Sequence, residues 1–175
     1  MSLLQRLFAP VLRSGPDPRE ELRPLWQAVV DEARRPQWYA QDGAVDTVSG
    51  RFDMVTAVLS VVLIRMEASE SLKVPSVMLT ELFVHDMDGQ LREFGVGDVI
   101  VGKRVGKLVG AMGGRLAAYR EGLAGDETAL TDAVRRNLTL RDGGDAEAVA
   151  RGIRIWADRL SRTDDAQLLA GAIAQ

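Results

Sequence analysis

The sequence contains no cysteine and a single histidine, His85, among its 175 residues. The absence of cysteine excludes disulfide bonds, thiolate metal ligands and a cysteine nucleophile. With one histidine, a metal site would need carboxylates for its other ligands, and a Ser-His-Asp triad would have one candidate base. Long apolar runs are also missing, since the longest, Met54–Ile64, has about 11 residues where a membrane span needs about 20. The sequence predicts a soluble, cytoplasmic protein.

The composition is that of one globular domain. Apolar residues make up 46% and charged residues 27% of the chain, which excludes a disordered or collagen-like protein. A length of 175 residues suits one ordinary domain with a sizeable core. The net charge of −3 argues against general nucleic-acid binding.

Apolar residues recur with a helical period along almost the whole chain. The pattern predicts an all-α fold, a single globular domain of about seven helices over residues 1–175. Residues 3–12 predict a terminal helix that packs on the core or on a partner, with membrane contact as the other interpretation. Residues 37–50, which include Gly43 and Gly50, are expected to form a loop. The remaining helices are expected near 18–35, 51–69, 75–95, 96–121, 126–139 and 145–161, with a short tail helix after Thr163.

No motif in the chain carries a catalytic or cofactor-binding constellation. Gly97–Lys103 has the glycine and lysine frame of a phosphate loop, but Arg104 follows where magnesium coordination needs Ser or Thr. Glu81, His85 and Asp88 share one helical face, an arrangement more typical of a polar helix surface than of a metal site. We therefore predict a protein that is not an enzyme, with no catalytic residues, no metal and no cofactor.

The segment after residue 95 is rich in glycine although its period is helical. Seven of the 17 glycines fall between Gly95 and Gly114, and each glycine inside a helix costs about 1 kcal/mol relative to alanine. Small residues at helical spacing allow another backbone to approach closely, which predicts that one lies against this face. On a helical projection the segment has three faces: an apolar one, a glycine one (Gly102, Gly106, Gly110, Gly113) and a cationic one (Lys103, Arg104, Lys107, Arg115).

Charge separates this segment from the one before it. Residues 65–94 hold three basic and six acidic side chains, whereas residues 95–120 hold five basic and one acidic. Two interpretations follow: the two helices pair their charges within the chain, or the cationic face recognises a partner. Charge alone does not decide between them.

Several sequence strings resemble the ubiquinol–cytochrome c chaperone family, the assembly factors of respiratory complex III. The most specific is HDMDGQLREFGVGD at residues 85–98, followed by VGKRV at 101–105. GRFDM at 50–54, GRLAAY at 114–119 and RRNL at 135–138 occur in the same order as in the family, so the similarity covers about residues 37–140. One departure is Ala111–Met112–Gly113, which stands where the family pattern has Phe-Tyr before Gly-Arg.

The resemblance implies an all-helical, cofactor-free chaperone that binds newly made cytochrome b, here as a bacterial member at the inner face of the cytoplasmic membrane. Mitochondrial members work with a small partner subunit and near the ribosome; neither partner is implied for this chain. The N-terminal helices (1–35) and C-terminal helices (145–174) would be extensions of the same domain. The alternative function is a helical binding protein for an apolar small molecule such as a lipid or quinone, which a large closed apolar cavity would favour.

The resemblance is densest from Arg92 to Arg104, and this places the expected partner-binding surface on the cationic face and the turn before it. Once the apolar face turns inward, the cationic side chains can face outward. We expect contact roles for Arg92, Lys103, Arg104, Lys107 and Arg115, and shaping roles for Gly95, Gly97, Asp98, Gly102 and Gly106.

Overall fold

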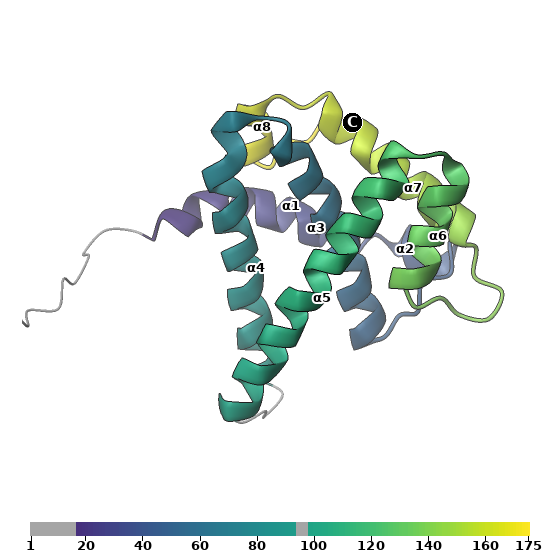
Figure 1. The fold of residues 1–175 in the computed structure, drawn as a ribbon, viewed down its shortest axis with the longest axis horizontal. Coiled ribbons are helices and arrows are strands. Elements are labelled where there is room, and N and C mark those ends of the chain that lie inside the picture. Colours follow the sequence, from purple (N-terminus) through teal and green to yellow (C-terminus); the bar gives the residue numbers. More distant parts are fainter. Residues whose placement is uncertain (1–16, 94–97) are drawn as a thin grey trace, which may run out of the picture.

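The computed structural model describes residues 17–93 and 98–175, and for residues 90–93 and 98–109 it describes the backbone alone. Within this part of the chain every regular element is a helix, so the predicted all-α class is confirmed (Figure 1). The helix expected at 3–12 lies outside the described residues. The elements are η2 (Pro18–Leu22), α1 (Arg23–Ala33), α2 (Pro36–Ala40), α3 (Val48–Glu67), η3 (Glu70–Leu72), α4 (Lys73–Glu93), α5 (Asp98–Ala124), α6 (Glu127–Asn137), α7 (Ala146–Ser161) and α8 (Asp165–Leu169).

Helix α3 lies at the centre of the fold because it is apolar on most of its sides, as the sequence predicts. Met54, Leu59 and Met66, which follow one another along this helix, are fully buried. Helices α1, α4, α5 and α7 all pack against α3, and α6 bridges α5 and α7. None of the described helices combines the length and the apolar content that crossing a bilayer requires.

Four of the described α-helices, α3, α6, α7 and α8, start at capping residues in the sequence. The side chains of Asp126, Asp145 and Asp164 each accept a hydrogen bond from the backbone N–H three residues further on, at 2.8–2.9 Å. Thr47 does the same at the start of α3, at 3.2 Å. Each of these bonds satisfies one of the N–H groups that a helix leaves unpaired in its first turn, which fixes where the helix begins.

The expected loop at 37–50 is wrong in its first part, where the chain forms α2. Pro36 occupies the first turn of this helix, a position that suits its fixed φ, so it both ends α1 and starts α2. Trp38 is buried and its Nε1 donates to the carbonyl oxygen of Glu32 at 2.7 Å. A Cβ on Gly152 of α7 would lie 2.5 Å from the Trp38 ring, so the absence of a side chain there lets α7 reach it.

Helices α1 and α7, which come from opposite ends of the described chain, belong to one packed body. Glu32 of α1 and Arg159 of α7 form an ion pair at 3.0 Å, and both side chains are largely buried. Arg65 at the end of α3 donates to the carbonyl oxygens of Leu160 and Thr163 at 3.1 and 2.9 Å. Polar contacts thus tie α1 to α7 and the end of α7 to α3, in addition to the packing of α1 and α7 against α3.

Candidate functional site

The residues singled out by the sequence lie on two helices that pack side by side, α4 and α5, which we call the α4–α5 arm. The end of α4 and the start of α5 project beyond the other described helices, whereas the second half of α5 crosses α3 and reaches α6 (Figure 1). The arm therefore has a free outer part and an inner part that belongs to the core.

Most of the expected site residues lie on the outer part of the arm. Arg92 is in the last turn of α4, and α5 begins at Asp98. Gly95 and Gly97 fall within 94–97, outside the described residues. For the others the structure gives a helical backbone and no side-chain position: Gly102, Lys103, Arg104, Gly106 and Lys107.

Arg115 points into the protein, which differs from the outward orientation expected for it. Its Nη2 donates to Oδ1 of Asp53 and its Nη1 to Oγ1 of Thr56, both at 2.6 Å. The guanidinium also lies over the Phe52 ring, 5.4 Å from the ring centre. Only 19% of the Arg115 side chain is exposed. This arginine anchors α5 to α3, and its role as a partner contact stays a prediction.

The carboxylate that receives Arg115 joins three parts of the chain. Asp53 on α3 also accepts hydrogen bonds through Oδ2 from the backbone N–H and the hydroxyl of Thr139, at 3.3 and 2.9 Å. One turn further along α5, Tyr119 is fully buried, and burial raises the pKa of its phenol. The inner part of the arm is thus a largely buried polar cluster in which Asp53 is hydrogen-bonded on both carboxylate oxygens, whereas the buried Tyr119 hydroxyl makes no hydrogen bond to a described residue.

The described cations of residues 95–120 pair with α3 and not with α4. Arg115 pairs with Asp53, and Arg120 forms an ion pair at the surface with Glu67. The charge pairing expected between residues 95–120 and residues 65–94 therefore occurs for Arg120, whose partner Glu67 is the last residue of α3, whereas Arg115 pairs with Asp53, outside the expected segment. The reason is geometric, because α5 crosses α3 where these residues lie.

The glycine face of α5 is open where the structure describes it. A Cβ added to Gly110, Gly113 or Gly114 would meet nothing within 4 Å. The expected close approach of another backbone is therefore wrong at Gly110 and Gly113. Close packing occurs further along the helix, at Gly122, where a Cβ would lie 2.9 Å from the Cα of Leu130 on α6. The sequence pattern did not indicate this position, because Gly122 is not part of the glycine face formed by Gly102, Gly106, Gly110 and Gly113.

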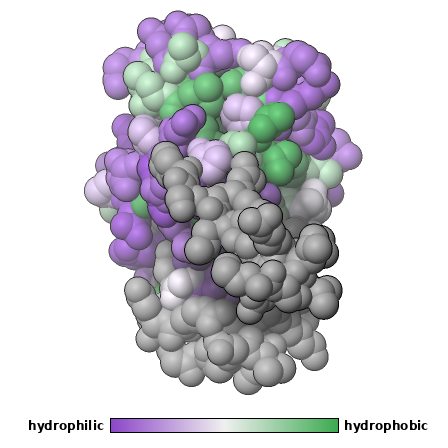
Figure 2. Space-filling model, turned by 90° about the vertical axis from the view of Figure 1, so that its left-hand side faces the viewer, coloured by the Kyte–Doolittle hydropathy of each residue, from purple (hydrophilic) through white to green (hydrophobic). Residues whose placement is uncertain are grey.

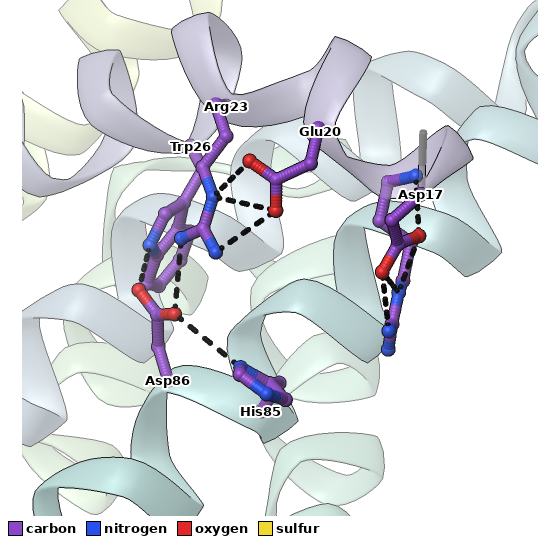
Figure 3. A network of polar contacts seen from close by, with 7 residues as sticks. Asp17, Glu20, Arg23, Trp26, His85 and Asp86 are labelled. Atoms are coloured by element: carbon purple, nitrogen blue, oxygen red, sulfur yellow. Dashed lines mark hydrogen bonds and ion pairs between the residues drawn. The ribbon is translucent and has the colours of Figure 1, made fainter. Parts of the chain in front are cut away.

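A polar network that sequence analysis did not identify holds α4 against the N-terminal helices (Figure 3). Asp86 of α4 accepts a hydrogen bond from Nε1 of Trp26 at 2.5 Å and pairs with Arg23 at 3.1 Å. Arg23 in turn bonds Glu20, while the exposed His85 lies 4.0 Å from Asp86. Asp86 and Trp26 are 60 residues apart in sequence, so no local pattern reveals their contact.

The described residues hold no cluster suited to a metal ion, and the glycine and lysine motif near residue 100 lacks the structure of a phosphate loop. Among them, no three His, Asp or Glu side chains gather where a metal ion could be held. Helix α5 starts at Asp98, so the second half of the Gly97–Lys103 motif is helical, and the segment before it is the helix α4 and not a strand. What the geometry provides is a helical surface, suited to contact with another polypeptide.

Comparison with known proteins connects this arm to a family. Residues 42–174 match the ubiquinol-cytochrome C chaperone family. The chain belongs to this family. The match includes α7 and α8, beyond the 37–140 region in which the sequence strings were found.

A solved structure agrees with the family assignment. The crystal structure of the Cbp3 homolog from Brucella abortus is 31% identical in sequence and superposes with a TM-score of 0.76. The similarity covers 89% of this chain and 88% of that one. A search of curated proteins gives no significant match. Membership in a chaperone family, and not in an enzyme family, assigns this chain a role in assembling the ubiquinol–cytochrome c reductase complex.

Proposed function

We propose that this chaperone binds newly made cytochrome b through the outer part of the α4–α5 arm. The observation that carries the proposal is the division of the arm, whose inner half is fixed to α3 by Arg115 while its outer half projects from the fold (Figure 1). A helix whose base is already fixed loses less entropy on binding than a segment that must first be ordered.

The chemistry of the outer arm suits a partner helix. Lys103, Arg104 and Lys107 are cations on a short stretch of α5, and Arg92 closes α4 nearby in sequence. Further along α5, the backbone at Gly110 and Gly113 is accessible, because a Cβ at either position would meet nothing within 4 Å. Small residues permit close helix–helix approach, and neighbouring cations set orientation and encounter rate. Gly95, Gly97, Asp98, Gly102 and Gly106 would shape this surface.

The alternative function, a carrier of a lipid or quinone, receives no support from the described residues. A hollow of about 410 Å³ between α6 and α7 is open to solvent and combines charged side chains, Glu127, Arg135 and Arg151, with apolar ones such as Leu130 and Ile155, so it is not a closed apolar cavity. A smaller hollow, of about 270 Å³, is below the usual size of a small-molecule site, which runs from roughly 300 Å³ upward. A chaperone that binds protein fits both findings.

The triple variant Lys103→Glu/Arg104→Glu/Lys107→Glu tests the proposal. We expect native helical circular dichroism and a melting temperature close to wild type, with loss of cytochrome b capture and of complex III assembly. The matched control is Arg34→Glu/Arg136→Glu/Arg151→Glu, which makes the same change of charge at exposed positions elsewhere. Normal assembly with the first variant would show that the client binds elsewhere, and equal loss with the control would show that total charge, not this surface, matters.

A further inference from the structure

An apolar groove of about 270 Å³ lies on the side of the molecule formed by η2, the start of α4 and α8. Beside it, the exposed side chains of Val74 and Val77 on α4 are 64% and 59% accessible. Figure 2, which faces the left-hand side of Figure 1, shows apolar residues in the upper part of the molecule, with hydrophilic residues above them and to both sides. The groove is lined by residues that include Pro18, Glu21, Leu22, Pro75, Met78 and Leu169.

The groove is held in shape by the chain around it. Its lining includes prolines at 18, 24 and 75, each of which fixes a backbone φ angle. Asp165 at the start of α8 accepts hydrogen bonds from Ser69, Ser71 and Arg65, which ties α8 to the segment before α4. A groove built this way exists before a ligand arrives.

The charges around the groove leave an excess of acid. Asp17, Glu20 and Glu70 are neutralised by ion pairs with neighbouring basic residues. Glu21 in the groove wall forms no ion pair with any described residue, whereas the exposed Glu81 on α4 is close enough to Arg19 to raise the pKa of that guanidinium. An apolar floor with an unpaired carboxylate in its wall complements an apolar segment that carries cations at one end.

We infer that this groove binds the end of an apolar helix followed by lysine or arginine, as found at the cytoplasmic end of a membrane-spanning segment. Such ends carry an excess of basic residues by the positive-inside rule. The inference rests on the proposed function, since it assigns a membrane-protein client. It gives the client a second contact, distinct from the cations of α5, which would repel a basic segment.

The test uses the full chain and two dye-labelled peptides, each a short run of Leu, Ala and Val that ends in either lysines or glutamates. Fluorescence anisotropy measures binding. We expect the lysine peptide to bind and the glutamate peptide not to bind. Val74→Gln/Val77→Gln, which removes apolar surface without adding charge, weakens lysine-peptide binding by about tenfold or more. Val48→Gln, which changes a valine that is 71% exposed on α3, leaves binding unchanged.

A second variant keeps the inference testable if the first one fails to fold. Glu21→Lys/Glu81→Lys retains the apolar lining and reverses the edge charge, so we expect the preference to shift toward the glutamate peptide. Equal binding of the two peptides by wild type, or unchanged binding in both variants, would overturn the inference. A chain lacking residues 1–16 that binds about tenfold more tightly would also overturn it, because the groove would then serve the chain's own apolar segment.

The inference and the proposed function can fail separately. If Val74→Gln/Val77→Gln captures cytochrome b normally while the α5 triple variant does not, the groove is not a client site and the proposed function stands. If wild type binds the lysine peptide but never captures cytochrome b, the groove has the predicted chemistry and the client assignment is wrong.

Discussion

Arg115 is a cation whose neighbours are a buried carboxylate, a hydroxyl and an aromatic ring. We predict that Arg115→Ala lowers the free energy of unfolding by about 3–5 kcal/mol, because it leaves Asp53 charged and buried without its partner. Urea unfolding followed by circular dichroism measures the change.

Arg120 provides the matched control for this prediction. It lies on the same helix and pairs with Glu67, but both side chains are close to half exposed. Arg120→Ala should therefore cost less than about 1 kcal/mol. Similar losses for the two variants would show that the Arg115–Asp53 pair is no better than a surface contact.

The open glycine face leads to a prediction of increased stability, in contrast to the destabilisation expected for the arginine variants. Gly113→Ala should stabilise the protein by up to about 1 kcal/mol, since the new methyl group meets nothing within 4 Å and alanine favours the helix. Gly122→Ala should destabilise it, because the methyl group would press on Leu130. Thermal unfolding of both variants measures the two effects, and a destabilised Gly113→Ala protein would mean that this face is covered in solution.

The orientation of Arg115 shows where prediction from residues stops. A helical projection places it next to an apolar face that includes Met112 and Leu116, and on that basis it can point either way. What turns it inward is Asp53, which lies 62 positions earlier and meets it only after α3 and α5 have packed. The same holds for Trp26 and Asp86, whose contact depends on tertiary structure.

At the scale of elements, the attachment of α8 depends on one ionised carboxylate. Hydrogen bonds from Ser69, Ser71 and Arg65 lower the pKa of Asp165 to about 2. A depressed folded-state pKa stabilises the fold above the unfolded value of about 3.9, and this contribution is lost as pH falls toward 2.

We therefore predict that Asp165→Asn is less stable than wild type at pH 6 and that the gap narrows as pH falls from about 4 toward 2. Free energies of unfolding from urea titrations at several pH values give the comparison. Asp142→Asn controls for the loss of one exposed acid. A gap that stays constant with pH would contradict the assigned role of the Asp165 carboxylate.

Periodicity predicted the long helices because each spans several turns. The short helix α2 was missed since its five residues cover little more than one turn, which is too short for a helical period to show. The expected helix at 18–35 is instead a 3-10 turn, η2, that leads into α1, and Pro24 stands where the second helix begins. The prolines indicated where these helices begin, but they did not show whether a 3-10 helix or an α-helix follows.

At the scale of the whole molecule, residues 37–140, which contain the strings that resemble the family, pack against helices outside that range. Trp26 of α1 and Trp156 of α7 are buried, and Trp156 donates to the carbonyl oxygen of Val58 on α3 at 3.3 Å. We predict that a fragment of residues 37–140 lacks a cooperative thermal transition, because it exposes two sides of α3. A chain of residues 17–175 is the control and should melt cooperatively; a cooperative fragment would show that the domain is smaller than the described fold.

The all-helical class, the central place of α3 and the family could be read from the sequence, because they rest on periodicity, apolar content and specific strings. The division of the arm could not, since it depends on where α5 crosses α3. The groove beside Val77 was also beyond reach, because η2, α4 and α8 come from distant parts of the chain. A surface to which several helices contribute can be identified only once the tertiary structure shows which helices lie side by side.

The hydrogen bond between Trp26 and Asp86 makes one of the three tryptophans an optical reporter of the arm (Figure 3). Trp38 and Trp156 are enclosed by helices of the core and should emit alike in the free and client-bound protein. The Trp26 indole instead donates to a carboxylate on α4, so any displacement of this helix changes the electric field at the ring. A shift in intrinsic emission would then follow client binding without any added label, with Trp26→Phe as the silent variant.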